Sequence, residues 1–186
     1  AESPTGYRFA DGFFRYMAFE VDDPSYDFMQ FDLARDLPKI QTIAEILSPT
    51  NPDLSAFRKN GGKLILYHGW ADPAISAYGT IDYYEQVVAN AGGKQVADGF
   101  VRLFLAPGMH HCRGGPGPNT FDALAALEEW VERGIAPARL IASHATDGKV
   151  DRTRPLCPEP QVARYIGQGS IDDAANFRCE TPARPR

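Results

Sequence analysis

Two apolar runs of strand length mark the middle of the chain, at residues 63–68 and 101–105. Neither run alternates strictly between apolar and polar positions, which is typical of a strand covered on both faces. Helical spacing of apolar residues follows each run, over residues 80–91 and 121–133, and Gly92-Gly93 end the first of these helices. Strand, helix, strand and helix in this order predict an α/β fold, with a parallel sheet and helices packed on its faces.

The first 40 residues have a different character, because aromatic and aspartate residues are mixed there without a sustained period of 2 or 3.6. We expect irregular structure that covers another part of the protein. A more regular pattern begins at about residue 41. It predicts a short helix near residues 38–47 and a helical turn at residues 53–59.

Composition narrows the classes of function. The 186 residues are 44% hydrophobic, which is enough for a packed core. The formal net charge of −5 and the absence of a Lys/Arg cluster argue against nucleic acid or an anionic membrane surface as a partner. No apolar run approaches the roughly 18 residues of a membrane-spanning helix. The chain starts with Ala1 and no signal-like segment follows, so we expect it to be a portion of a longer protein.

Ionisable residues follow both predicted strands. Asp72 comes after the first strand, and His111 lies in the glycine- and proline-rich loop 108–117 after the second. Ligands of parallel sheets bind at the carboxyl ends of the strands, and an Asp that orients a His base is the support pair of a hydrolytic triad. The α/β-hydrolase order is Ser, Asp, His, and this chain supplies the last two. No Gly-x-Ser-x-Gly occurs in it, so the nucleophile is expected outside the chain.

The three cysteines cannot all pair within one chain. Cys157 and Cys179 bracket a polar, proline-containing loop, and a disulfide there would stabilise by about 3 kcal/mol on a loop-entropy argument. Such a bond implies an oxidising compartment, hence a secreted or periplasmic protein. Cys112 is then left over, either as a free thiol or with a partner elsewhere.

Three segments, residues 62–72, 80–85 and 108–117, resemble the tannase and feruloyl esterase family, which includes the mono(hydroxyethyl) terephthalate hydrolases. The resemblance extends over residues 12–179. Members of the family carry a Cys-Ser, Asp, His-Cys pattern in which the two cysteines form a disulfide. Asp72 matches the Asp, and His111-Cys112 match the His-Cys.

The resemblance implies an organisation for the whole chain. Residues 1–40 would be the C-terminal end of a lid domain, and residues 41–186 the C-terminal portion of an α/β-hydrolase domain. The Cys-Ser element and the calcium-binding loop of the lid would lie upstream, so no cofactor or metal is expected in this chain. The partner of Cys112 would lie outside the chain, and an N-terminal hydrolase portion that carries the nucleophile is a candidate partner.

The resemblance also implies a reaction, the hydrolysis of carboxylic esters of aromatic acids of the feruloyl, galloyl or terephthaloyl type, through a Ser-Asp-His triad. Asp72 and His111 are the predicted catalytic residues. His68, Ala74 and Ile75 flank Asp72 closely enough to line the substrate pocket. This chain alone is expected to be inactive, because the serine is absent from it.

Three alternatives stay open at this point. His110 could replace His111 as the base by composition, although the family pattern places the base directly before the cysteine. Asp72, His110, His111 and Cys112 are all plausible zinc ligands, although adjacent residues point in different directions and structural zinc sites favour spaced pairs. A catalytically inactive fragment or binding module that keeps the hydrolase fold is the third. His144 is expected to be a structural or surface residue.

Overall fold

The computed structural model describes residues 4–183. The chain forms two compact units, residues 1–51 and residues 52–186, and each is described by itself. This division falls after Asn51, whereas the predicted organisation divides the chain after residue 40.

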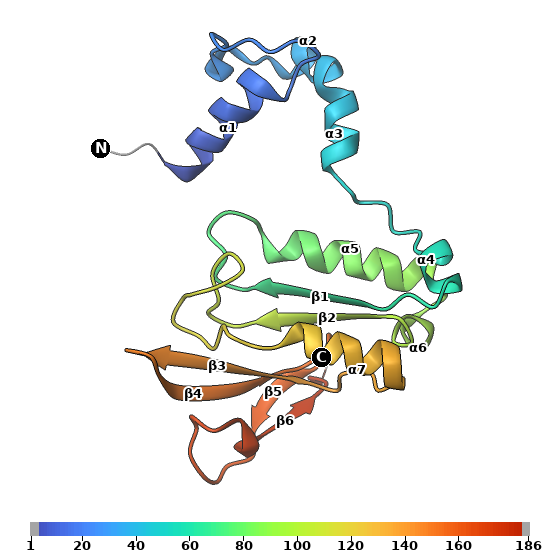
Figure 1. Cartoon of the computed structure of the whole chain (residues 1–186), viewed down its shortest axis with the longest axis vertical. Coiled ribbons are helices and arrows are strands. Elements are labelled where there is room, and N and C mark those ends of the chain that lie inside the picture. Colours follow the sequence, from blue (N-terminus) through green and yellow to red (C-terminus); the bar gives the residue numbers. More distant parts are fainter. Residues whose placement is uncertain (1–3, 184–186) are drawn as a thin grey trace. The chain divides into compact units, whose positions relative to one another are not determined.

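The first unit is built from short helices (Figure 1). They are α1 (Thr5–Tyr16), the 3-10 helix η1 (Phe28–Gln30), α2 (Leu33–Asp36), the 3-10 helix η2 (Leu37–Ile40) and α3 (Gln41–Leu47). The helix predicted near residues 38–47 is present as η2 followed by α3. Asp36 is buried between α2 and η2, where Arg35 and Lys39 both form ion pairs with its carboxylate.

Helix α1 corrects the expectation of irregular structure at the start of the chain. Two glycines weaken the helical signal of its sequence, since each costs roughly 0.5–1 kcal/mol in a helix interior. The helix is supported instead by packing, because the ring of Phe14 contacts aromatic rings beyond the helix, namely Phe19, Tyr26, Phe28 and Phe31. Within Thr5–Tyr16 apolar residues do recur at helical spacing, at Tyr7, Ala10 and Phe14, a signal that a search for one period across residues 1–40 misses.

The second unit contains the predicted α/β elements. They are α4 (Ser55–Lys59), β1 (Leu64–Gly69), α5 (Ala77–Asn90), β2 (Val101–Ala106) and α7 (Ala123–Arg133), and the short helix α6 (Lys94–Ala97) was not predicted. Strands β1 and β2 pair in parallel, in a register that runs from Leu64 opposite Val101 to Gly69 opposite Ala106. The prediction of an α/β fold with a parallel strand pair and flanking helices is confirmed.

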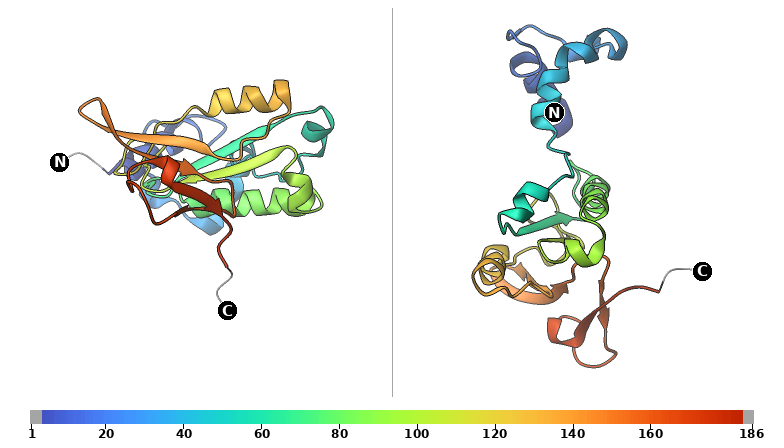
Figure 2. Two further views of the ribbon diagram at one scale, coloured as in Figure 1. Left: turned by 90° about the horizontal axis from the view of Figure 1, so that it is seen from below. Right: turned by 90° about the vertical axis from the view of Figure 1, so that its right-hand side faces the viewer.

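Helices α5 and α7 lie on opposite sides of the β1–β2 pair (Figure 2). On the α5 side, side chains of both strands pack with the helix in one apolar cluster that includes Leu64, Leu66, Tyr84, Val87, Val101 and Leu103. On the other side, Arg102 of β2 lies over the ring of Trp130 of α7, at 5.8 Å from the ring centroid. Ile65 and Phe104 also belong to an apolar cluster on that side, with Ala126 of α7. Both faces of the pair are therefore covered, which explains why the strand sequences are mostly apolar.

The segment after α7 forms antiparallel strands that the sequence analysis did not predict. Strand β3 (Leu140–Thr146) pairs with β4 (Lys149–Leu156), and β5 (Val162–Tyr165) pairs with β6 (Phe177–Glu180), with the 3-10 helix η3 (Ala174–Asn176) before β6. The predicted disulfide between Cys157 and Cys179 is present, with the two Cα atoms 5.5 Å apart. The polar loop between these cysteines is therefore held by a strand pair as well as by the covalent bond. Within residues 4–183, no helix is both long and apolar enough to span a membrane.

Candidate functional site

The parallel pairing of β1 and β2 places the loops after both strands at the same edge of the sheet. These loops carry Asp72 and His111, which are 39 positions apart in the sequence. The Nδ1 atom of His111 lies 2.8 Å from Oδ2 of Asp72, at hydrogen-bond distance. The structure thus brings together the two residues that the sequence predicts as acid and base.

The carboxylate of Asp72 is held by its own loop. The backbone N–H groups of Ala74 and Ile75 donate to Oδ1 at 2.8 and 2.9 Å, and the side chain is only 3% exposed. Burial by itself raises the pKa of Asp72. The hydrogen bonds from Ile75, His111 and Ala74, together with the charge of the imidazole, outweigh burial and lower the pKa well below its usual range. Asp72 is therefore a fixed, ionised hydrogen-bond acceptor at neutral pH.

His111 is accessible where Asp72 is not, since its side chain is 52% exposed. Because Nδ1 faces an ionised carboxylate, it carries a proton and donates it in the hydrogen bond. Nε2 is then the ring nitrogen that can accept a proton from a reactant. This orientation and tautomer are those of a general base.

A second imidazole contacts the same carboxylate. Nε2 of His68, near the end of β1, lies 3.3 Å from Oδ2 of Asp72 and 3.1 Å from the carbonyl oxygen of Ile75. Its Nδ1 lies 2.8 Å from Oγ1 of Thr80, in the first turns of α5. His68 is thus engaged at both nitrogens, and its side chain is only 12% exposed.

Close backbone contacts hold the loop 108–117, which carries His111 and is called the histidine loop from here on, against the end of β1. The N–H of Trp70 donates to the carbonyl of Ala106 at 3.0 Å, and that of Ala71 donates to the carbonyl of Met109 at 3.0 Å. A Cβ atom at Gly69 would collide with the carbonyl oxygens of this loop, at Met109 and His110. Glycine is therefore required here so that the two loops can approach each other.

Two hollows adjoin the pair. One of about 150 Å³ contacts Asp72 and His111 and is lined by Tyr67, His68, Gly69, Asp72, Met109, His111 and Cys112. The other, of about 300 Å³, is lined by residues 70 and 72–78, which include the predicted pocket residues Ala74 and Ile75. Trp70 and Tyr78, which the sequence analysis did not single out, form an edge-to-face aromatic pair in this hollow, with centroids 5.5 Å apart.

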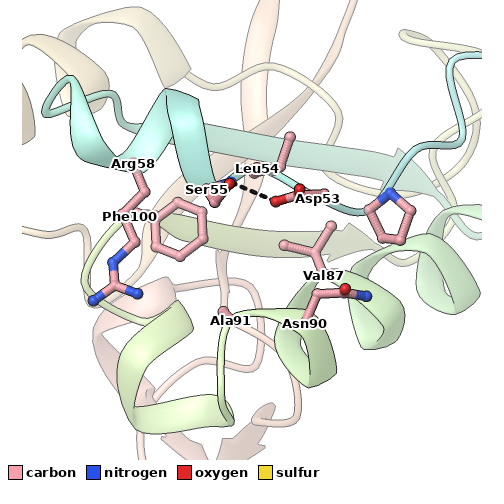
Figure 3. A pocket seen from close by; sticks show the side chains of 9 residues that line it. Asp53, Leu54, Ser55, Arg58, Val87, Asn90, Ala91 and Phe100 are labelled. Carbon is pink, nitrogen blue, oxygen red and sulfur yellow. Dashed lines mark hydrogen bonds between the residues drawn. The ribbon is translucent and has the colours of Figure 1, made fainter.

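A further hollow, shown in Figure 3, lies away from this edge of the sheet. Its volume is about 60 Å³, and it is lined by residues of α4, α5 and the turn before β2, including Val87, Asn90 and Phe100. Phe100 precedes the first residue of β2, whereas His111 follows the last. This hollow is therefore at the amino end of the strand and contains neither Asp72 nor His111.

The remaining candidate residues are placed as follows. Cys112 has an exposed thiol, free within the described part of the chain, and a positive φ of 63°. His144 lies on the β3–β4 hairpin, where its Nδ1 is 2.7 Å from Oδ1 of Asp151. Among residues 4–183 no group of three or more His, Cys, Asp or Glu is arranged to hold a metal ion, which gives the zinc alternative no support.

Comparison with known proteins gives matches over most of the chain. A family model described as "Tannase and feruloyl esterase" matches residues 8–180. The chain belongs to this family. The mono(2-hydroxyethyl) terephthalate hydrolase of Piscinibacter sakaiensis is 55% identical over 136 residues, which cover 72% of this chain and 22% of that protein. A probable feruloyl esterase of Arthroderma benhamiae is 41% identical over 172 residues, which cover 87% of this chain and 32% of that protein.

A solved member of the tannase and feruloyl esterase family has the same fold over most of the chain. The crystal structure of feruloyl esterase B from Aspergillus oryzae superposes with a TM-score of 0.77 at 30% identity, covering 91% of this chain and 36% of that one. The chain thus spans about a third or less of the length of the relatives it matches.

Proposed function

We propose that this chain supplies the acid and the base of a serine carboxylesterase that acts on esters of aromatic acids. The observation that carries the proposal is the hydrogen bond between Asp72 and His111, in which the acid is buried and the base is accessible. The family supports the substrate class, because its relatives are named as feruloyl esterases and a mono(2-hydroxyethyl) terephthalate hydrolase.

The proposed reaction is acyl transfer through a serine that lies outside these 186 residues. Nε2 of His111 takes the proton of the serine hydroxyl while the serine oxygen attacks the ester carbonyl. The resulting imidazolium returns the proton to the departing alcohol, which leaves an acyl-enzyme. Water then attacks the acyl group with the same histidine as base. Asp72 keeps its negative charge throughout, orients the imidazole and stabilises the imidazolium.

The proposal assigns a role to the other parts of the chain. Residues 1–40 are the end of a lid domain, and residues 41–186 are the C-terminal portion of an α/β-hydrolase domain. The exposed thiol of Cys112 forms a disulfide with a cysteine next to the serine, in the upstream portion of the protein. Ala74 and Ile75 line part of the substrate pocket. Disulfide formation agrees with a secreted or periplasmic location.

The test uses the full-length protein that contains this chain. Hydrolysis of methyl ferulate and mono(2-hydroxyethyl) terephthalate is measured for the unmodified protein and for His111→Gln and Asp72→Asn. We expect both variants to lose activity by roughly 10³–10⁴-fold. A fluorophosphonate probe should label one serine upstream of this chain, and labelling should be lost in His111→Gln.

The second His–Asp pair provides the matched control. His144→Gln and Asp151→Asn remove a hydrogen bond of similar length on the β3–β4 hairpin, so both should keep the activity of the unmodified protein. An active protein in which His111→Gln matches His144→Gln would contradict the proposed base. No hydrolysis and no labelling by the unmodified protein would contradict the proposed activity.

A further inference from the structure

The geometry points to His68 as a positioning residue that holds the carboxylate of Asp72 through a fixed Nε2–H tautomer, with Thr80 holding His68 in turn. This inference rests on the proposed function, because it concerns the acid of the proposed triad. It gives His68 a role other than the sequence-based expectation that this residue binds substrate.

The neighbours of Nε2 determine the tautomer. This atom faces the carbonyl oxygen of Ile75 at 3.1 Å and the carboxylate of Asp72 at 3.3 Å. Both oxygens can only accept hydrogen bonds, since Asp72 is ionised. Nε2 therefore carries the proton, donates it to the carbonyl oxygen of Ile75 and places it next to the carboxylate of Asp72. In the neutral ring Nδ1 is then an acceptor, and the hydroxyl of Thr80 donates to it at 2.8 Å.

The consequence for Asp72 is that both oxygens are fixed from separate parts of the fold. Oδ1 receives two backbone N–H groups of its own loop. Oδ2 accepts from Nδ1 of His111 and lies 3.3 Å from Nε2 of His68, which comes from β1. Hydrogen bonds on both oxygens, together with the adjacent His68 ring, resist rotation of the carboxylate when His111 changes charge, so the imidazole keeps its orientation through the reaction.

The low exposure of the His68 side chain favours a positioning role over substrate binding. The side chain of His68 is 12% exposed, against 52% for His111, and both of its nitrogens are already engaged within the protein. A hydrogen bond from His68 to substrate would require one of these hydrogen bonds to break. The other His–Asp pair of the chain, His144 and Asp151, has a third residue in Thr146, but that hydroxyl donates to the carboxylate directly. It therefore serves as a matched control.

The kinetic test compares substitutions at both positions in the full-length protein. His68→Leu should lower kcat by roughly 10–100-fold with little change in KM. The loss should be equal for methyl ferulate, mono(2-hydroxyethyl) terephthalate and p-nitrophenyl acetate, because Asp72 serves every substrate alike. His68→Gln places an amide N–H near the position of Nε2 and should restore most of the lost kcat.

Thr80 gives a second and milder variant. Thr80→Val removes the hydroxyl at nearly constant volume and should lower kcat by roughly 3–10-fold, while Thr80→Ser should retain activity. His144→Leu and Thr146→Val, in the control pair, should leave kcat unchanged. Should His68→Leu fail to fold, the Gln variant and the two Thr80 variants still decide the inference.

A spectroscopic readout tests the tautomer directly. In protein labelled with ¹⁵N-histidine, the resonances that disappear in His68→Gln should show a protonated Nε2 and an unprotonated Nδ1 at neutral pH. An Nδ1–H tautomer would overturn the inference. So would a loss that falls on KM and differs among the three esters, because that pattern belongs to a substrate contact.

The two proposals fail in different ways. A protein that hydrolyses the esters and needs His111, but tolerates His68→Leu, overturns the role of His68 alone. A protein without any esterase activity overturns the proposed function, and the ¹⁵N spectrum then reports on the His68 tautomer independently.

Discussion

The pairs His111–Asp72 and His144–Asp151 differ in what surrounds the acid. The distances are nearly equal, 2.8 Å for His111 and Asp72 and 2.7 Å for His144 and Asp151. The side chain of Asp72 is 3% exposed and receives two backbone N–H groups, whereas that of Asp151 is 39% exposed. A carboxylate fixed out of water orients an imidazole far more firmly than one that solvent can reach.

The lowered pKa of Asp72 predicts how stability depends on pH. Because the folded-state pKa lies below the unfolded value, Asp72 contributes stability above about pH 4, and this contribution is lost as pH falls through the folded-state pKa. Asp72→Asn lacks the contribution. The difference in free energy of unfolding between the unmodified protein and Asp72→Asn should therefore shrink on acidification.

Urea denaturation of both proteins between about pH 2 and pH 7 provides the measurement. A difference that stays constant across this range would show that ionisation of Asp72 does not stabilise the fold. His111 must be present in both proteins, since its hydrogen bond is one cause of the lowered pKa.

At this scale the sequence predicts part of the site. Asp72 and His111 can be found because each follows a predicted strand and the family pattern includes them. The contact between His68 and Thr80 could not be found, since it depends on how the start of α5 lies against the end of β1. Trp70 and Tyr78 likewise meet only in the folded loop.

At the scale of elements, the close approach at Gly69 makes the junction between β1 and the histidine loop sensitive to any added side-chain atom. Gly69→Ala would place a Cβ atom against the carbonyl oxygens of Met109 and His110. We expect a loss of roughly 1–3 kcal/mol in the free energy of unfolding, and a loss of activity as the loop moves. Chemical denaturation and ester hydrolysis by the full-length protein measure the two effects.

Gly79, in the first turn of α5, is the matched control. A Cβ atom there would meet no atom within 4 Å, so Gly79→Ala should stabilise by roughly 0.5–1 kcal/mol through helix propensity. Equal free energies of unfolding for the two alanine variants would show that the close approach at Gly69 does not limit stability.

The β3–β4 hairpin carried a signal that the sequence analysis did not use. Asp147-Gly148 join the strands with φ of 49° and 77°, as expected of an Asp-Gly hairpin turn. Helix α1 also carried a signal, the helical spacing of its apolar residues, and the contacts of Phe14 with distant rings add support that the sequence does not show. The strand pair β1–β2 was predictable because cover on both faces makes its sequence mostly apolar.

The disulfide between Cys157 and Cys179 should stabilise the β5–β6 pair more than the rest of the fold. Replacing both cysteines by alanine should lower the free energy of unfolding by about 2–4 kcal/mol. Hydrogen exchange should show faster exchange in β5 and β6 and unchanged exchange in β1 and β2. A uniform increase over all strands would contradict a local effect.

At the scale of the molecule, the division after Asn51 predicts where a protease cuts first. Residues 48–51 follow the end of α3 and are all exposed, and they belong to no helix or strand. Brief digestion of the full-length protein with a protease of broad specificity should first cut at residues 48–51. Mass spectrometry of the fragments locates the cut, and a first cut in loop 107–119 would contradict the expectation.

The loop that holds Asp72 also selects the length of the acidic side chain. Its two N–H groups belong to the residues two and three positions further along, a geometry that the short side chain of an aspartate reaches from its own backbone. A glutamate in its place would keep the charge but carry the carboxylate past these donors. This site can therefore use aspartate alone, although serine hydrolases of this order accept either acid.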